Sequence, residues 1–120
     1  MSHLSINDLE IYRDAMEFGE TMWSLVEDWD YFAKDTVGKQ LVRCADSIAA
    51  NISEGHGRFH FKENKQFCYY ARGSLQETQT FIEKASRREL ISTEEGRVFY
   101  KQLEQLKTRL NAYINSIGNK

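Results

Sequence analysis

The fold is decided by the stretch Ser47-Ile48-Ala49-Ala50-Asn51-Ile52-Ser53-Glu54-Gly55-His56-Gly57-Arg58, together with the later stretch Ala71-Arg72-Gly73-Ser74-Leu75-Gln76-Glu77. The first runs from the end of an apolar helical pattern through two glycines into a basic segment. The second places a glycine and a serine in the middle of a long helical pattern. No bond-making step that we can name requires this order of residues, whereas the geometry of a helical bundle does. The two stretches therefore indicate a binding or assembly protein rather than a catalyst.

The chain has 120 residues and no proline. A chain of this length folds around a single core, so we expect one domain over residues 1–120. The absence of proline favours a few long, uninterrupted helices and argues against loop-rich and all-β architectures. Because the apolar runs are too short to span a membrane, we expect no membrane association.

Cysteine usage and the N-terminal residues indicate a compartment. Cys44 and Cys68 are isolated and lack the Cys-x-x-Cys spacing of metal and redox sites. Residues 1–8 lack the basic start and the apolar core of a secretory signal. We therefore expect both thiols to be reduced and buried in a cytoplasmic protein.

The formal net charge of −2 conceals an asymmetry along the chain. Residues 1–30 carry −7, with Arg13 as their only base, whereas residues 31–120 carry +5. Such a split can orient a partner or a second copy of the chain, and it can equally be the solvated acidic face of one helix. The balance is not that of a strongly basic nucleic-acid-binding protein.

Hydrophobic spacing predicts a first helix over residues 8–28, with Asn7 as its N-cap, and a second helix over residues 36–53. The expected apolar positions of the first helix are Leu9, Tyr12, Met16, Trp23 and Val26. The aromatic side chains of the connector, residues 28–32, are expected to pack against the bundle. We expect Gly55 or Gly57 to end the second helix with a left-handed backbone conformation.

The spacing predicts a third helix over residues 62–88 and a fourth that begins at the capping box Ser92-Thr93-Glu94-Glu95. The third has a broad apolar seam of Phe67, Ala71, Ser74, Thr78, Phe81 and Ala85, widened by Leu75 and Ile82. The fourth has a heptad seam of Phe99, Leu103, Leu106, Leu110, Tyr113 and Ile117. Heptad spacing and short connections predict an all-α, up-down-up-down antiparallel four-helix bundle.

Several of these segments resemble one protein family, and they occur in its order over nearly the whole chain. They are Asp8-Leu9-Glu10-Ile11-Tyr12, Ser47-Ile48, Asn51-Ile52, Glu54-Gly55-His56-Gly57-Arg58, Gly73-Ser74-Leu75 and Glu77. The family is that of the 23S rRNA intervening-sequence proteins, also labelled S23 ribosomal proteins. The chain departs from the family pattern at Ser53, where alanine is usual, and in its mildly acidic charge.

The resemblance implies a small bacterial four-helix bundle protein, often a homopentamer, with no known enzymatic activity. Some members are encoded inside insertions in large-subunit rRNA genes, so the ribosomal label reflects gene location. A related branch, the accessory protein of diversity-generating retroelements, binds nucleic acid and a reverse transcriptase. The resemblance therefore implies a homo-oligomer whose partner is RNA, DNA or another protein.

The residues at the two glycines have a structural interpretation and a binding one. Gly55 and Gly57 can form a backbone nest for a phosphate, although glycines more often let a chain leave a helix. Glu54 lies in the last turn of a helix, where the dipole disfavours an anion, so we expect Arg58 or Arg72 to pair with it. With Asn51 it is expected to belong to a network that holds the turn.

Gly73 and Ser74 lie in the middle of a predicted helix, where glycine costs about 1 kcal/mol relative to alanine. We expect this cost to be offset by the close approach of another helix, either within the bundle or across a subunit interface. Ser47 is expected to serve in the same way.

One segment is locally basic, and its candidate nucleic-acid contacts are Arg58, Lys62, Lys65 and Arg72. Aromatic residues interleave with them, namely Phe59, Phe61, Tyr69 and Tyr70. Cations and aromatic rings in this arrangement are typical of grooves that bind nucleic acid by backbone contact and stacking. The alternative is an ordinary solvated helix start whose aromatic side chains pack in the bundle or between subunits.

We expect no metal, cofactor or catalytic residue. A di-iron bundle requires inward Glu-x-x-His pairs, and the sequence has none. His56 and His60 have a spacing that can bind a metal on a helix, but His56 lies between two glycines. The sequence therefore favours a non-enzymatic, oligomeric binding or scaffold module for nucleic acid or a nucleic-acid enzyme. The alternative is a self-assembling structural protein without a nucleic-acid role.

Overall fold

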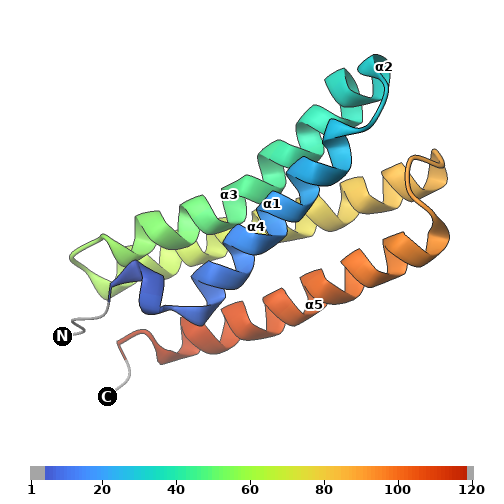
Figure 1. Ribbon diagram of the computed structural model, residues 1–120. Coiled ribbons are helices and arrows are strands. Elements are labelled where there is room, and N and C mark those ends of the chain that lie inside the picture. The colour runs from blue at the N-terminus through green and yellow to red at the C-terminus, as the bar shows by residue number, and fades with distance from the viewer. Residues whose placement is uncertain (1–4, 119–120) are drawn as a thin grey trace.

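A computed structural model describes residues 5–118, and within this range the chain forms helices and no strand. The long helices are α1 (Glu10–Glu27), α3 (Lys39–His56), α4 (Phe61–Arg87) and α5 (Thr93–Ser116). Shorter elements are η1 (Ile6–Asp8), α2 (Tyr31–Ala33) and the π-helical turn η2 (Lys34–Gly38). The four long helices run up, down, up and down along the bundle (Figure 1), so the predicted all-α, antiparallel four-helix bundle is confirmed.

One prediction concerns the N-terminal residues. The expectation that residues 1–8 carry no secretory signal falls partly on residues 1–4, which lie outside the described residues. In the described part of the chain, no helix is long and apolar enough to cross a membrane.

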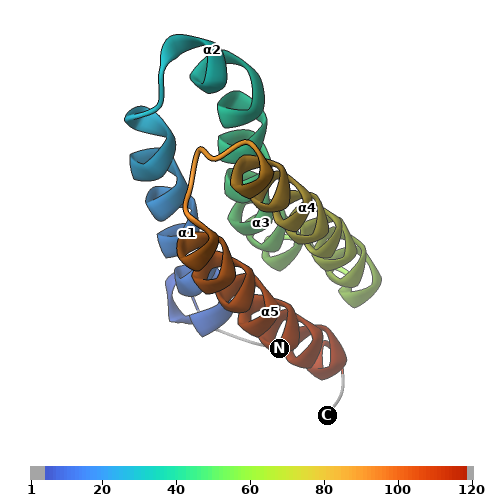
Figure 2. The same ribbon diagram turned by 90° about the vertical axis from the view of Figure 1, so that its right-hand side faces the viewer.

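Helix α3 lies between α1 and α4 (Figure 2) and packs against both. Its inward face consists of Leu41, Cys44, Ala45, Ile48, Ile52 and Gly55, all buried. Leu75 of α4, which belongs to the predicted seam of the third helix, is buried as well. Both predicted thiols are also buried and free, although Cys68 was absent from the predicted apolar seam.

Helix α5 follows its sequence signals closely. Glu95 N–H donates to Ser92 Oγ at 3.0 Å, and Ser92 N–H donates to Glu95 Oε1 at 2.9 Å, so the capping box forms as predicted. Within the heptad seam, Leu103, Leu106 and Leu110 are buried. Phe99 and Tyr113 are only half-buried, and Ile114 joins the core beside the latter.

The prediction for the start of the first helix was wrong. Ser5, rather than Asn7, supplies the capping side chain, which accepts from Asn7 N–H at 3.2 Å at the start of η1. The predicted buried face of this helix was right at Val26 and in part at Leu9 and Tyr12, which pack half-buried against the core. Met16 and Trp23 are 45% and 57% exposed. The buried face consists of Ile11, Ala15, Phe18, Gly19, Met22 and Val26, because the small residues of this ridge let α1 approach α3 closely.

The connector also differs from its prediction. Tyr31 and Phe32 are 79% and 77% exposed, and only Trp29 packs against the core. Asp30 caps a helical turn that starts at Tyr31, since its Oδ1 accepts from Ala33 N–H at 3.0 Å. Helical structure therefore begins before residue 36, and the π-helical turn η2 leads it into α3.

We predict that Leu106→Ala lowers the free energy of unfolding by about 2–5 kcal/mol, because it leaves a cavity in the core. The matched control is Gln105→Ala, an exposed neighbour on the same helix, which should change it by less than about 0.5 kcal/mol. Denaturant unfolding followed by circular dichroism measures both. Equal, small effects would show that the heptad seam does not form the core.

Candidate nucleic-acid interface

The corner between α3 and α4 depends on Gly55, and for a reason other than the predicted one. Neither glycine of the corner has positive φ; Gly57 has φ −80° and ψ −3°. The prediction of a left-handed glycine was therefore wrong. A Cβ atom on Gly55 would lie 2.9 Å from Asn64 O and 3.0 Å from Phe67 Cβ, so glycine is required where α4 crosses the last turn of α3.

The predicted ion pair at this corner is confirmed for one of its two candidate partners. Arg58 donates to Glu54 Oε2 at 2.7 Å, and its guanidinium lies 4.7 Å from the centre of the Phe67 ring. Arg72, the other candidate, donates to Asn111 of α5 instead. Asn51 donates to Ser47 O at 2.9 Å within α3, so it braces its own helix, and no bond from it to Glu54 is observed in the described residues.

Gly73 lies on an exposed face of α4. A Cβ atom added there would meet no atom of the described residues within 4 Å. Close approach of another helix within the bundle, one of two explanations for this glycine, is therefore excluded for the described part of the chain. Ser74 is half-buried and its carbonyl accepts from Thr78 Oγ1 at 2.7 Å. Contact with a second subunit stays the open explanation for Gly73.

Three of the four candidate cations lie on one stripe of α4. Lys62, Lys65, Tyr69 and Arg72 follow each other at steps of three, four and three residues, which places them along one side of a helix. Arg58 precedes the helix and belongs to the Glu54 pair instead. The structure thus separates Arg58 from the stripe formed by the other candidates.

The stripe combines fixed and unpaired cations. Arg72 donates to Asn111 Oδ1 of α5 at 2.7 Å, and its guanidinium lies 5.1 Å from the centre of the Tyr69 ring. Lys62 and Lys65 have neither an ion pair nor a hydrogen bond with any described residue. Phe61 and Tyr69 are partly exposed beside them. The stripe can therefore place two lysine charges and aromatic surface against a polyanion.

The acidic charges concentrate on other surfaces. Asp14 of α1 pairs with Arg109 of α5. Asp46 of α3 faces α1, and burial, followed by the nearby charge of Glu20, raises the pKa of its carboxyl group above the usual value. These carboxylates lie where α1 faces α3 and α5, away from the stripe on α4.

The thiols, the carboxylate of Glu54 and the metal-binding side chains have environments that bear on catalytic chemistry. The described residues contain no group of three or more side chains suited to hold a metal ion. Burial raises the pKa of the Cys68 thiol to about 11 and also raises that of Cys44, so neither supplies a thiolate near neutral pH. Glu54 is occupied by Arg58.

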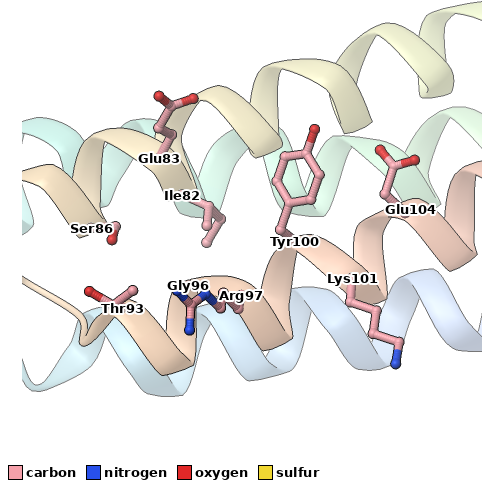
Figure 3. A pocket seen from close by; sticks show the side chains of 9 residues that line it. All are labelled: Ile82, Glu83, Ser86, Thr93, Gly96, Arg97, Tyr100, Lys101 and Glu104. Carbon is pink, nitrogen blue, oxygen red and sulfur yellow. The ribbon is translucent and has the colours of Figure 1, made fainter.

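A groove between α4 and α5 was missed by the sequence analysis. It encloses about 530 Å³ and is lined by residues of both helices, among them Ile82, Gly96 and Tyr100 (Figure 3). Tyr100 is 46% exposed. The sequence could have indicated that Tyr100 lies beside the core face, because Tyr100 directly follows the heptad residue Phe99 and one residue along a helix turns a side chain by about 100°.

The fold and this interface define an antiparallel four-helix bundle with one basic, aromatic helix face. The 23S rRNA-intervening sequence protein family model matches residues 7–112, and the chain belongs to this family. A crystal structure of a protein of unknown function from the S23 ribosomal protein family of Bacteroides thetaiotaomicron has the same fold, with a TM-score of 0.79. The two chains are 21% identical over 88% of this chain and 99% of the other. None of the curated proteins matches this chain.

We predict opposite effects of alanine at the two corner glycines. Gly55→Ala forces α4 away from α3 and should lower the free energy of unfolding by about 1–3 kcal/mol. At Gly57 a Cβ atom has 3.6 Å of room and the backbone suits any residue, so alanine there should raise stability by up to about 1 kcal/mol. Thermal and denaturant unfolding of both variants tests this. A tolerated Gly55→Ala would contradict the close crossing.

Proposed function

We propose that this protein is a non-enzymatic, self-associating scaffold that binds nucleic acid through the stripe Lys62, Lys65, Tyr69 and Arg72. The observation that carries the proposal is the placement of two unpartnered lysines, an exposed tyrosine and a fixed arginine on one side of α4. Lys62 is exposed and Lys65 is half-buried. Lysines without acidic partners are available to phosphates, and stacking surface beside them suits bases.

The binding proposed here tolerates any sequence. Lysine and arginine side chains reach phosphates, whereas sequence is distinguished by contacts to base edges in a groove. No arrangement of a recognition helix with a dimer spacing accompanies the stripe in the described residues. Arg58 adds to the charge only by giving up its pair with Glu54, so it contributes less than the lysines. The family name refers to 23S rRNA, which makes RNA the first nucleic acid to test.

Self-association is proposed from the apolar surface that one copy leaves uncovered. The exposed aromatic side chains include Trp23, Tyr31, Phe32, Phe59 and Tyr70. Large aromatic side chains left exposed on a protein surface can mark the contact sites of a second subunit. The pentameric number comes from the family resemblance alone. If nucleic acid does not bind, this same surface favours the alternative of a structural self-assembling protein.

We predict that Lys62→Glu with Lys65→Glu weakens binding to all RNA and DNA sequences alike, because these side chains contact phosphates. The slope of log K against log salt should fall in magnitude by about two, one unit for each lost phosphate contact. Fluorescence anisotropy with labelled RNA and DNA at several salt concentrations measures both effects.

The matched control is Lys34→Glu with Lys84→Glu, which makes the same change in net charge at unpartnered lysines away from the stripe. It should leave the slope nearly unchanged. Equal loss in both double variants would mean that only overall charge matters. Absence of binding by the unaltered protein at low salt would reject the nucleic-acid role and leave the structural alternative.

We predict that Gly73→Ala stabilises the isolated subunit by about 1 kcal/mol and weakens its self-association. The first effect follows from helix propensity on an exposed face with no atom within 4 Å. The second follows from the proposed contact with a second subunit at this glycine, which a methyl group would obstruct. Unfolding experiments and sedimentation equilibrium separate the two, with Gly57→Ala as the control glycine. A monomer mass for the unaltered protein would overturn self-association without touching the nucleic-acid proposal.

A further inference from the structure

The groove between α4 and α5 has an apolar floor and an exposed aromatic wall. Ile82 and Gly96 lie at its centre, and a Cβ atom on Gly96 would come within 3.4 Å of Ser86 Oγ. Because Gly96 has no side chain, the groove stays open at this position. Tyr100 lies between the two helices (Figure 3), with 46% of its surface exposed. A flat apolar ring of moderate size fits this shape.

The groove continues the same seam that holds the basic stripe. Arg72 bonds Asn111 at one point of the α4–α5 seam, and Gln79 donates to Glu104 Oε2 at 2.7 Å at a second point. Glu104 lines the groove. The ten helical steps from Arg72 to Ile82 cover about 15 Å, so stripe and groove lie end to end on one side of the bundle.

The charges at the groove do not exclude a polyanion, because its carboxylates already have cationic partners. Glu83 pairs with Arg87 at 2.7 Å, and Glu104 pairs with Lys107 at 3.2 Å. Hydrogen bonds from Gln79 and then from Lys107 lower the pKa of Glu104, which keeps it ionised and bound in this network. Lys101 lines the groove without an ion pair or hydrogen bond to any described residue, and it points to the side opposite Glu83 (Figure 3).

We infer that the α4–α5 seam binds single-stranded nucleic acid, with a base stacked on Tyr100 in the groove and the backbone running from Lys101 to the stripe. The inference rests on the proposed nucleic-acid role and adds the strand type and the base site. A base must be unpaired and splayed out for its face to stack on a single ring at the wall of a groove between two helices. A duplex offers phosphates to the lysines but no free base to the groove.

The experiment measures binding of a labelled oligouridine of about twelve nucleotides, within the site sizes of non-specific binders, and of an RNA hairpin of equal length. Tyr100→Ala should weaken oligouridine binding about five- to a hundredfold, as expected for loss of one stacked base. Tyr100→Phe keeps the ring and should retain binding. Val98→Ala removes an apolar side chain of the same helix that has a similar exposure, 45%, but does not line the groove, and it should have no effect. Circular dichroism checks that each variant is folded.

The possible outcomes separate the two proposals. If Lys62→Glu with Lys65→Glu weakens binding but Tyr100→Ala does not, the stripe stands and the groove is rejected. If the hairpin binds as tightly as oligouridine, the single-strand specificity is rejected. If Tyr100→Ala changes the mass of the assembly and leaves binding intact, the groove belongs to a second copy of the chain, which also overturns the inference. If the unaltered protein binds neither RNA at low salt, both proposals fail.

Discussion

The close crossing of α4 over the last turn of α3 is the constraint on which the rest of the structure depends. It is possible because Gly55 has no side chain where Asn64 O and Phe67 Cβ approach. This crossing sets the rotation of α4 about its own axis, so that Cys68, Ala71 and Leu75 face the core. The stripe with the lysines then lies on a flank of the same helix beside α5, where Arg72 bonds Asn111. Gly55, which the sequence analysis interpreted as a turn residue, thus determines which residues of α4 are exposed to solvent.

The sequence predicts the fold best where its signals are local. The capping box at Ser92 involves residues within one turn and forms as predicted. The heptad seam of α5 is buried at its leucines but only half-buried at Phe99 and Tyr113. The prediction of the buried face of the first helix failed in part because two rows of residues on this helix both have helical spacing. The ridge with Tyr12, Met16 and Trp23 has larger side chains, but the ridge with Ala15 and Gly19 is buried. Close packing selects the small residues, since a Cβ atom on Gly19 would lie 2.7 Å from Asp46 Oδ1, and a single sequence does not reveal which neighbour approaches.

The candidate interface was predictable in part for the same reason. Lys62, Lys65 and Arg72 share a helix, so their spacing placed them together. Arg58 lies before the start of α4, where the helical phase is interrupted, and it turns to Glu54. The groove at Tyr100 requires α4 and α5 to be placed side by side, which no residue pattern within either helix specifies. Tertiary contacts such as Arg72 with Asn111 and Gln79 with Glu104 define this seam.

The distribution of paired and unpaired charges follows from this arrangement and bears on function more than on stability. Exposed ion pairs such as Arg87 with Glu83 and Lys39 with Asp35 contribute little to folding, typically about 0.2–1 kcal/mol. Folding therefore gains little by pairing every surface charge, and a lysine without a partner is no defect. What distinguishes Lys62, Lys65 and Lys101 is that they border one seam whose carboxylates are already neutralised by neighbours. A polyanion along that seam gains attraction from the free cations without displacing any existing pair, whereas on the side of Glu20 and Asp46 it meets like charge.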